Sequence, residues 1–315
     1  MIKDRVIQYL GIPKAEIDRI ERNAPNRYKR YQIPKATGGK RTIYQPPPET
    51  KALQYSLMSL YFEDMSVHDI AMAYQRGKSS PQRATALAHS EYEYSVRIDF
   101  KDFFYSIKPV DIFSNADFVN KDNKSDTKFL KNCCFVYDDK DWWLAMGAPS
   151  SPIISNIVLY NLDERMFRCS NKVDPNSVLT RYADDVVFST NDEGGCFEFY
   201  DLCRSVIESH DSPCLSINET KTSFMSRGNR RVVAGLVITP DGRVSIGRDK
   251  KRKISAMVHQ FSIGILDEEE IGRLQGYLSW ILDVEPDLYD RFAVRYGAEV
   301  VRNALRGIVP EGTDA

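Results

Sequence analysis

The chain has 315 residues, with 43 Lys and Arg against 44 Asp and Glu and a formal net charge of −1. Its charged and hydrophobic fractions, 28% and 42%, are ordinary for a folded soluble protein. No apolar stretch approaches 18 residues and residues 1–6 lack the apolar core of a secretion signal, so we expect no membrane association. The six cysteines include no Cys-x-x-Cys pair, so we expect reduced thiols in a cytoplasmic protein without structural zinc.

The distribution of charge is more informative than its sum. Residues 27–51 carry seven Lys and Arg against one acid, and residues 243–253 carry six against one. Acidic residues gather between and after these two blocks, as at 138–141 and 267–270. Two basic blocks around an acidic centre would suit a bound polyanion, and two solvated faces explain them equally well.

The first third of the chain predicts helices followed by a hairpin. We expect helix over residues 1–24, broken at Gly11-Ile-Pro13. Short strands at 31–35 and 40–44 are joined through Gly38-Gly39, which predicts a hairpin with Lys and Arg at its tip. A helix follows from about 49 to 63.

Further elements alternate along the rest of the chain. Residues 95–100 alternate as a strand, and the aromatic run to Ile107 either continues this strand or turns into a helix. From there the patterns predict a helix at 150–167, a hairpin at 179–189, a helix at 196–209, a short strand at 215–218, a hairpin formed by 232–238 with 244–246, and helices from 250 to the end. Strands give way to helices near 245–250, which is the best domain boundary.

Three carboxylates are the candidate chemical centre. Asp184 and Asp185 occupy the tip of the 179–189 hairpin, where they repel each other unless a cation lies beside them. Asp99 ends an apolar strand, where a buried carboxylate needs a cation or a donor. If the strands are neighbours, the three could converge on two divalent ions that assist in-line phosphoryl transfer. A solvated Asp-Asp turn and an ordinary strand-end Asp are the alternatives.

Six sequence segments, taken in their order along the chain, indicate the type of protein more specifically than the three carboxylates do. They are Lys40-Arg-Thr-Ile-Tyr44, Arg97-Ile-Asp-Phe-Lys-Asp-Phe-Phe104, Gly147-Ala-Pro-Ser-Ser-Pro152, Tyr182-Ala-Asp-Asp185, Leu215-Ser-Ile-Asn-Glu-Thr-Lys-Thr222 and Val233-Ala-Gly-Leu-Val237. This series, over about residues 25–250, resembles the bacterial reverse transcriptases, most closely the retron group. The resemblance implies an α+β right-hand polymerase, with fingers and palm in residues 1–245 and a helical, RNA-binding thumb in 246–315.

The resemblance also implies roles for single residues. Asp99, Asp184 and Asp185 would bind two Mg²⁺ ions, and Lys221 would protonate the pyrophosphate leaving group. Phe104 would exclude a 2′-hydroxyl, and the remaining dNTP contacts would come from Lys40, Arg41, Met146 and Gly147. The start of the helix after Gly147 is either a plain loop and N-cap or a place where exposed amides meet phosphate or the template strand. RNA would be held through phosphates by the basic start of the thumb, namely Arg248, Lys250, Lys251, Arg252 and Lys253.

The chain departs from the family pattern at three places. Met146 stands where Gln commonly precedes Gly-Ala-Pro. Thr85-Ala-Leu-Ala-His89 replaces the retron segment Asn-Ala-x-x-His, and Val233-Ala-Gly235 replaces Val-Thr-Gly. The last two weaken the retron assignment more than the polymerase assignment, and we expect His89 to be a structural histidine.

The implied activity is RNA-directed DNA synthesis on part of a cognate structured non-coding RNA. A retron enzyme would start from an internal guanosine 2′-hydroxyl, make a branched RNA–DNA (msDNA), and work with an effector protein in phage defence. The alternatives are another bacterial reverse transcriptase lineage that makes linear cDNA, a non-catalytic RNA-binding scaffold, and a nucleotidyl cyclase. Intact Asp99, Asp184 and Asp185 oppose the scaffold, and the Gly-Ala-Pro-Ser-Ser-Pro segment opposes the cyclase.

Overall fold

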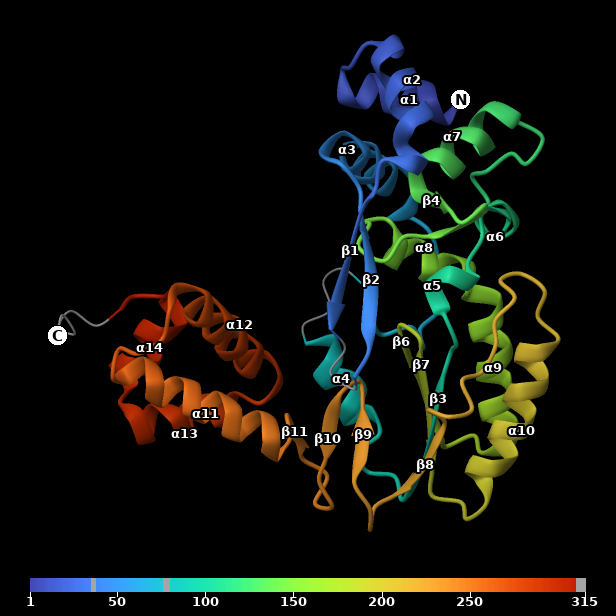
Figure 1. Cartoon of the computed structure of the whole chain (residues 1–315). Helices are drawn as coiled ribbons and strands as arrows, with labels where there is room; N and C mark the ends of the chain where they lie inside the picture. Colours follow the sequence, from blue (N-terminus) through green and yellow to red (C-terminus); the bar gives the residue numbers. More distant parts are fainter. Residues whose placement is uncertain (35–37, 76–79, 310–315) are drawn as a thin grey trace. The chain divides into compact units, whose positions relative to one another are not determined.

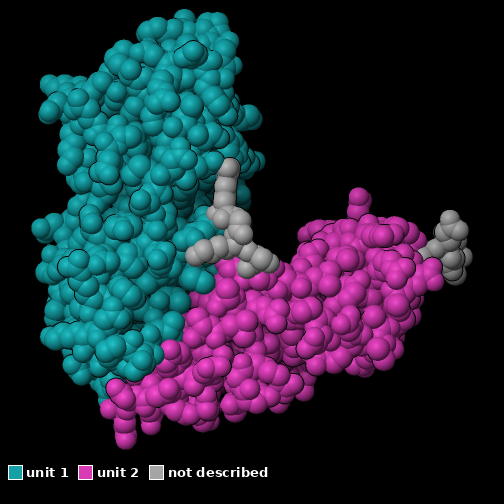
Figure 2. All heavy atoms as spheres, turned by 180° about the vertical axis from the view of Figure 1, so that it is seen from behind, with its two compact units in different colours: residues 1–75, 96–188, 194–223 teal, residues 76–95, 189–193, 224–315 magenta. Residues whose placement is uncertain are grey.

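The computed structural model describes residues 1–34, 38–75 and 80–309. The chain divides into two compact units: unit 1 comprises residues 1–75, 96–188 and 194–223, and unit 2 comprises residues 76–95, 189–193 and 224–315 (Figure 2). Helices are mixed with antiparallel strand pairs, which confirms the predicted α+β class. None of the helices in the described ranges is long and apolar enough to span a bilayer.

The N-terminal helices and the first hairpin of unit 1 form as predicted (Figure 1). The elements up to residue 62 are α1 (Ile2–Leu10), α2 (Lys14–Asn23), η1 (Ala24–Asn26), β1 (Lys29–Pro34), β2 (Lys40–Gln45), α3 (Pro48–Leu57) and the π-helical turn η2 (Met58–Phe62). Gly11, with φ 64°, ends α1 by donating its N–H to the Ile7 carbonyl. Strands β1 and β2 pair antiparallel, with Pro34 opposite Lys40. Lys35, predicted to end the first strand, lies outside the described residues.

The middle of the chain contains more elements than the sequence patterns predict. From residue 94 to 208 these are β3 (Tyr94–Asp99), α5 (Phe103–Ser106), α6 (Pro109–Asn115), α7 (Lys124–Cys134), β4 (Phe135–Asp138), β5 (Asp141–Leu144), α8 (Ser151–Val158), α9 (Tyr160–Val173), β6 (Val178–Tyr182), β7 (Asp185–Thr190) and α10 (Gly195–Glu208). The aromatic run after β3 is helical in α5, and the single helix predicted at 150–167 is divided at Leu159 into α8 and α9.

A four-stranded sheet positions the candidate site. Its order is β6-β7-β3-β8, where β8 is Ser223–Ser226, so β3 lies beside the β6–β7 hairpin. Helices α9 and α10 lie side by side along the sheet (Figure 1). Phe188 of β7 stacks on Phe199 of α10 with ring centroids 4.2 Å apart. The strand predicted at 215–218 does not form: the segment makes only one bridge, between Phe100 and Ile217.

Unit 2 consists of a small sheet and a helical bundle. Its elements are α4 (Pro81–Ala88), β9 (Arg231–Val233), β10 (Leu236–Ile238), β11 (Val244–Ser245), α11 (Arg248–Ser262), α12 (Glu268–Val284), α13 (Pro286–Tyr296) and α14 (Ala298–Arg306). The predicted strand 232–238 is wrong as one strand. Ala234 and Gly235 have φ values of 48° and 76°, which turn the chain so that β9 pairs with β10. The predicted pairing of the 232–238 segment with residues 244–246 is present between β10 and β11.

Candidate active site

The three candidate carboxylates lie on adjacent strand ends of the central sheet. Asp99 is the last residue of β3, and Asp185 is the first residue of β7 after a tight turn at Ala183 with φ 58°. The Phe100 N–H donates to the Asp184 carbonyl over 3.0 Å, which fastens the end of β3 to this turn. Residues that are distant in the sequence are thereby brought together.

Asp184 and Asp185 are half-buried beside the buried Asp99, and this environment raises the pKa of both. Burial is the main cause that raises the pKa of Asp184, and Asp99 adds to it. Burial also raises the pKa of Asp185 to about 6, where the nearby Arg97 lowers it and the other two carboxylates raise it. Such a cluster favours a bound cation, because a cation would offset both the desolvation and the mutual repulsion.

Asp99 is held by the segment that follows α10. Lys221 Nζ lies 2.9 Å from both carboxylate oxygens of Asp99, and Asn218 Nδ2 donates to Oδ2 over 3.2 Å. Backbone bonds fix the same segment, since the Asn218 N–H donates to the Asp99 carbonyl and the Lys101 N–H to the Ser216 carbonyl. Lys221 remains half exposed, so its ammonium can move between Asp99 and the space in front of it.

The donor set has the chemistry of a magnesium site. Carboxylate oxygens are the ligands that Mg²⁺ prefers, and one buried and two half-buried carboxylates at adjacent strand ends match that preference. In the described part of the chain, no three His, Cys, Asp or Glu side chains are close enough to hold an ion as they stand. Lys221 provides the positive charge at Asp99 in this conformation, so it would have to leave when an ion binds.

A cavity of about 660 Å³ opens in front of Asp99 and Asp184 within unit 1. Its lining includes most residues proposed to contact the nucleotide, namely Lys40, Arg41, Phe104, Met146, Asp99, Asp184 and Lys221. A second cavity of about 340 Å³ is lined by Phe104, Met146 and Gly147. The sequence-predicted nucleotide residues therefore share one region, although they come from five separate segments.

The hairpin that carries Lys40 and Arg41 is joined to the Gly147 loop through the backbone. The Tyr44 N–H donates to the Met146 carbonyl over 2.8 Å. Gly147 has φ 112°, and a Cβ added there would lie 2.8 Å from Ile43 Cγ2 and 3.1 Å from the Tyr44 carbonyl oxygen. Only glycine fits this close approach, so the geometry requires glycine at position 147.

Phe104 stands at the border of both cavities. It belongs to α5, which follows Asp102, a residue with φ 48°. The neighbouring Phe103 is buried and stacks on Phe100, with ring centroids 6.0 Å apart. Phe103 therefore anchors the helix while Phe104 faces the open space, as a gate residue would.

Two residues near the site were missed by the sequence patterns. Arg181 is completely buried and donates to Asp163, to Asn156 Oδ1 and to the carbonyl of Ala183 in the Asp-Asp turn. Tyr74, with φ 65°, lines both cavities. Although the Tyr74 side chain is exposed overall, partial desolvation by the surrounding protein, with Asp184 as a further cause, raises its pKa to about 12. An arginine inside the predicted 179–189 hairpin, next to the Asp pair, was the available signal for Arg181.

His89 and the basic block lie in unit 2. His89 is fully buried, its Nδ1 lies 2.8 Å from Ser189 Oγ, and burial lowers its pKa to about 3, an environment suited to a neutral structural histidine. Along α11, Lys251 pairs with Glu285 at 2.5 Å. The side chains of Arg248, Lys250, Arg252 and Lys253 are exposed. Four of the five predicted RNA contacts are thus presented to solvent.

Comparisons with known proteins show the family to which the chain is related. Residues 33–257 match the family model described as reverse transcriptase (RNA-dependent DNA polymerase). The chain is 33% identical to the retron Ec73 reverse transcriptase of Escherichia coli over 88% of this chain and 89% of that protein. It is also 33% identical to the Ec83 enzyme over 88% and 89%, and 31% identical to the Ec86 enzyme over 84% and 79%, both from Escherichia coli.

Among solved structures, the chain is similar to telomerase from Candida albicans in complex with a telomeric RNA fragment. The identity is 12% over 96% of this chain and 63% of that chain, with a TM-score of 0.48. The family match and the retron relatives confirm the resemblance and the enzyme class that the sequence motifs imply. The chain belongs to the reverse transcriptase family, is most like its retron members, and is an RNA-directed DNA polymerase.

Proposed function

We propose that this polymerase copies part of a cognate structured RNA into a branched RNA–DNA, starting from an internal guanosine 2′-hydroxyl, within a phage-defence system. The observation that carries the polymerase site is the placement of Asp99, Asp184 and Asp185 at adjacent strand ends, with Asp99 and Asp184 in the lining of a cavity that also includes Lys40, Arg41 and Lys221. The likeness to named retron reverse transcriptases supports the branched product.

In the proposed reaction a primer hydroxyl attacks the α-phosphorus of a dNTP and pyrophosphate leaves. Asp99, Asp184 and Asp185 would hold two Mg²⁺ ions, which lower the pKa of the hydroxyl and stabilise negative charge on the phosphates. Lys40 and Arg41 bind the triphosphate, to which they bring two positive charges. Lys221 donates a proton to the pyrophosphate oxygen as it leaves, moving from Asp99 to that position.

Selection of the sugar is assigned to Phe104. Phe104 lines the cavity, and in the proposed complex its ring would lie beside the deoxyribose, where a ribose 2′-hydroxyl would collide with it. Met146 offers an apolar side chain to the nucleotide in place of an amide, so contact at this position is by packing. Gly147 provides close backbone approach instead of a side chain.

Residues 1–245 are assigned to fingers and palm and residues 246–315 to the thumb. The exposed cations on α11, namely Arg248, Lys250, Arg252 and Lys253, bind RNA phosphates, with Lys251 as a fifth cation that pairs with Glu285. We place the protein in the cytoplasm, where its six free thiols would stay reduced. An effector protein of the same system is a further proposed partner.

Sequencing the nucleic acid that copurifies with the protein tests the retron product. A branched RNA–DNA whose 2′,5′ linkage is opened by debranching enzyme is the expected result, and a linear cDNA would favour another bacterial lineage. For the polymerase site, Asp184→Asn should lower Mg²⁺-dependent dNTP incorporation on an RNA template by at least about 100-fold with RNA affinity retained. Asp192→Asn, at an exposed position, is the matched control. Full activity of Asp184→Asn would contradict the assignment of Asp184 to the polymerase site.

A further inference from the structure

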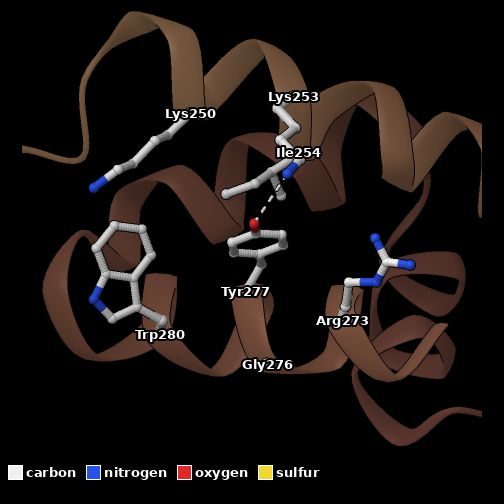
Figure 3. Close-up of a pocket in the computed structure, with 7 residues that line it drawn as sticks. All are labelled: Lys250, Lys253, Ile254, Arg273, Gly276, Tyr277 and Trp280. Carbon is white, nitrogen blue, oxygen red and sulfur yellow. Dashed lines mark hydrogen bonds between the residues drawn. The ribbon is translucent and has the colours of Figure 1, made fainter. Parts of the chain in front are cut away.

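A cavity of about 590 Å³ lies between α11 and α12, within unit 2 and apart from the carboxylate site. Figure 3 shows its lining: one wall is α11 and the opposite wall is α12, with side chains from both helices directed into the space between them. The lining residues are Lys250, Lys253, Ile254, Arg273, Gly276, Tyr277 and Trp280. Aromatic rings and cations thus share one groove.

The α12 wall presents two aromatic rings. Tyr277 and Trp280 are three residues apart, which places them on the same face of the helix (Figure 3). Trp280 Nε1 donates to Gln82 Oε1 over 2.8 Å, and Gln82 Nε2 donates to the Ala234 carbonyl over 2.7 Å. The indole is therefore held in orientation and its N–H is already used, so it offers a ligand its ring surface.

Gly276 lies beside the two rings in the groove lining and adds no side chain to the α12 wall. A Cβ added at Gly276 would meet no atom within 4 Å, and its backbone is helical. Packing does not require glycine there, although glycine weakens a helix interior. The missing side chain leaves room next to Tyr277 for a flat group.

Three cations surround this aromatic wall. Lys250 Nζ lies 4.7 Å from the centre of the Trp280 ring, and Lys253 Nζ lies 5.3 Å from the centre of the Tyr277 ring and 3.2 Å from its hydroxyl. Arg273 pairs with Glu269 at 3.1 Å on the exposed surface of α12. None of the seven described lining residues is acidic, so the groove attracts an anion.

We infer that the groove between α11 and α12 binds an unpaired nucleotide of an RNA strand, with the base against Trp280 and Tyr277 and the flanking phosphates on Lys250 and Lys253. An isolated phosphate would make no use of the rings, and an acidic peptide would not need two of them. A paired base presents only its edge, whereas an unpaired base presents the flat face that an aromatic wall binds. The inference rests on the proposed role of the thumb in RNA binding and goes beyond contact with a stem.

Because the Trp280 N–H is bonded to Gln82, the rings recognise a base by stacking. Stacking tolerates any base, so we expect little sequence preference at this nucleotide. The lysines lie over the rings through cation–π attraction, which is weak at exposed sites, and they are long enough to swing to phosphates when a base takes their place.

The test measures binding of a fluorescein-labelled 12-nucleotide single-stranded RNA of mixed sequence and of a blunt 12-base-pair RNA duplex. Trp280→Ala should weaken binding of the single strand about tenfold and change duplex binding less than twofold, and Trp280→Phe should retain most affinity. Arg302→Ala, which removes an exposed cation of α14 outside the groove, is the charge control. Circular dichroism and a melting curve for each variant show that it is folded.

A second measurement follows the protein's own fluorescence. The single strand should quench tryptophan emission in the parent protein, and the quench should be lost in Trp280→Phe, which keeps Trp142 and Trp143. Unchanged single-strand affinity in Trp280→Ala, an equal loss on the duplex, or an unchanged quench in Trp280→Phe overturns the inference. An equal quench by 1 mM ATP shows a free-nucleotide site instead of a strand site and also overturns it. These assays need no catalysis, so their outcome is separate from that of Asp184→Asn.

Discussion

Arg181 and Asp163 form a bidentate ion pair, with N–O distances of 2.7 and 2.6 Å, in which neither side chain has exposed surface. The same guanidinium donates over 3.1 Å to the carbonyl of Ala183, in the turn that carries the Asp pair. A buried charge that loses its partner is costly. The pair therefore connects the stability of α9 and β6 with the position of the candidate catalytic turn.

Removing the Asp163 carboxylate that pairs with Arg181 should destabilise the protein and disturb the turn at Ala183. Asp163→Asn should lower the free energy of unfolding by about 3–5 kcal/mol, because the guanidinium stays buried without a counter-charge. Denaturant unfolding measures the loss. Arg204→Ala, which breaks the exposed pair with Glu208, is the control and should cost below about 1 kcal/mol. Equal, small losses in both variants would contradict the structural role of the pair.

Gly147→Ala should damage nucleotide binding. The added Cβ would press on Ile43 Cγ2 and the Tyr44 carbonyl at a φ that L-residues rarely adopt. The hairpin bearing Lys40 and Arg41 would then shift, so we expect a rise of about tenfold or more in KM for dNTP in steady-state primer extension. Gly228→Ala, where a Cβ meets nothing within 4 Å, should leave KM unchanged. An unaltered KM in Gly147→Ala would disprove the close approach.

Phe104→Ala should relax discrimination between deoxyribonucleotides and ribonucleotides. The ring borders both cavities, and its removal opens space for a 2′-hydroxyl. The ratio of kcat/KM for dNTP to that for the matching rNTP should fall by about 10- to 100-fold. Phe104→Tyr keeps the ring and should keep the ratio. If the ratio in Phe104→Ala equals that of the parent enzyme, another residue is the gate.

His89 should make stability depend on pH. Burial lowers its folded-state pKa to about 3, against about 6.5 when unfolded, so the folded protein keeps the ring neutral. The stability that depends on the neutral His89 ring is fully present above pH 6.5. It is lost as pH falls from there toward the folded-state pKa, by about 1.4 kcal/mol per pH unit. The free energy of unfolding, measured with urea between pH 7.5 and 4.5, should fall less steeply with decreasing pH in His89→Gln than in the parent protein. The exposed His259→Gln should follow the parent curve, and identical slopes in all three would refute the prediction.

The exposed cations of α11 should set the salt dependence of RNA binding. Arg248→Ala with Arg252→Ala should reduce the slope of log affinity against log salt by about 1 to 2, since each phosphate contact contributes about 0.9. Lys251→Ala should change that slope less, because Lys251 is paired with Glu285. Its main effect should be on thermal stability. A slope unchanged by the double substitution would locate the RNA on another surface.

The sequence predicted those parts of the fold that local patterns determine. The β1–β2 and β6–β7 hairpins carry alternating side chains and turn residues, and both form. The continuous apolar pattern predicted one strand over residues 232–238, whereas the positive φ values of Ala234 and Gly235 divide it into two paired strands. The Lys221–Asp99 contact and the Arg181 bonds depend on tertiary packing between distant segments, which periodicity does not encode.

The backbone bond between the Tyr44 N–H and the Met146 carbonyl has a practical consequence for enzyme engineering. Position 146 fastens the loop to the hairpin through its carbonyl, which every amino acid possesses, while its side chain is left to line the cavity. Met146 can therefore be substituted without loss of the backbone hydrogen bond to the hairpin. The neighbouring Gly147 cannot, because any side chain there would collide with the hairpin. A saturation library at this one position would explore altered substrate scope, including base-modified nucleotides, on an otherwise unchanged scaffold.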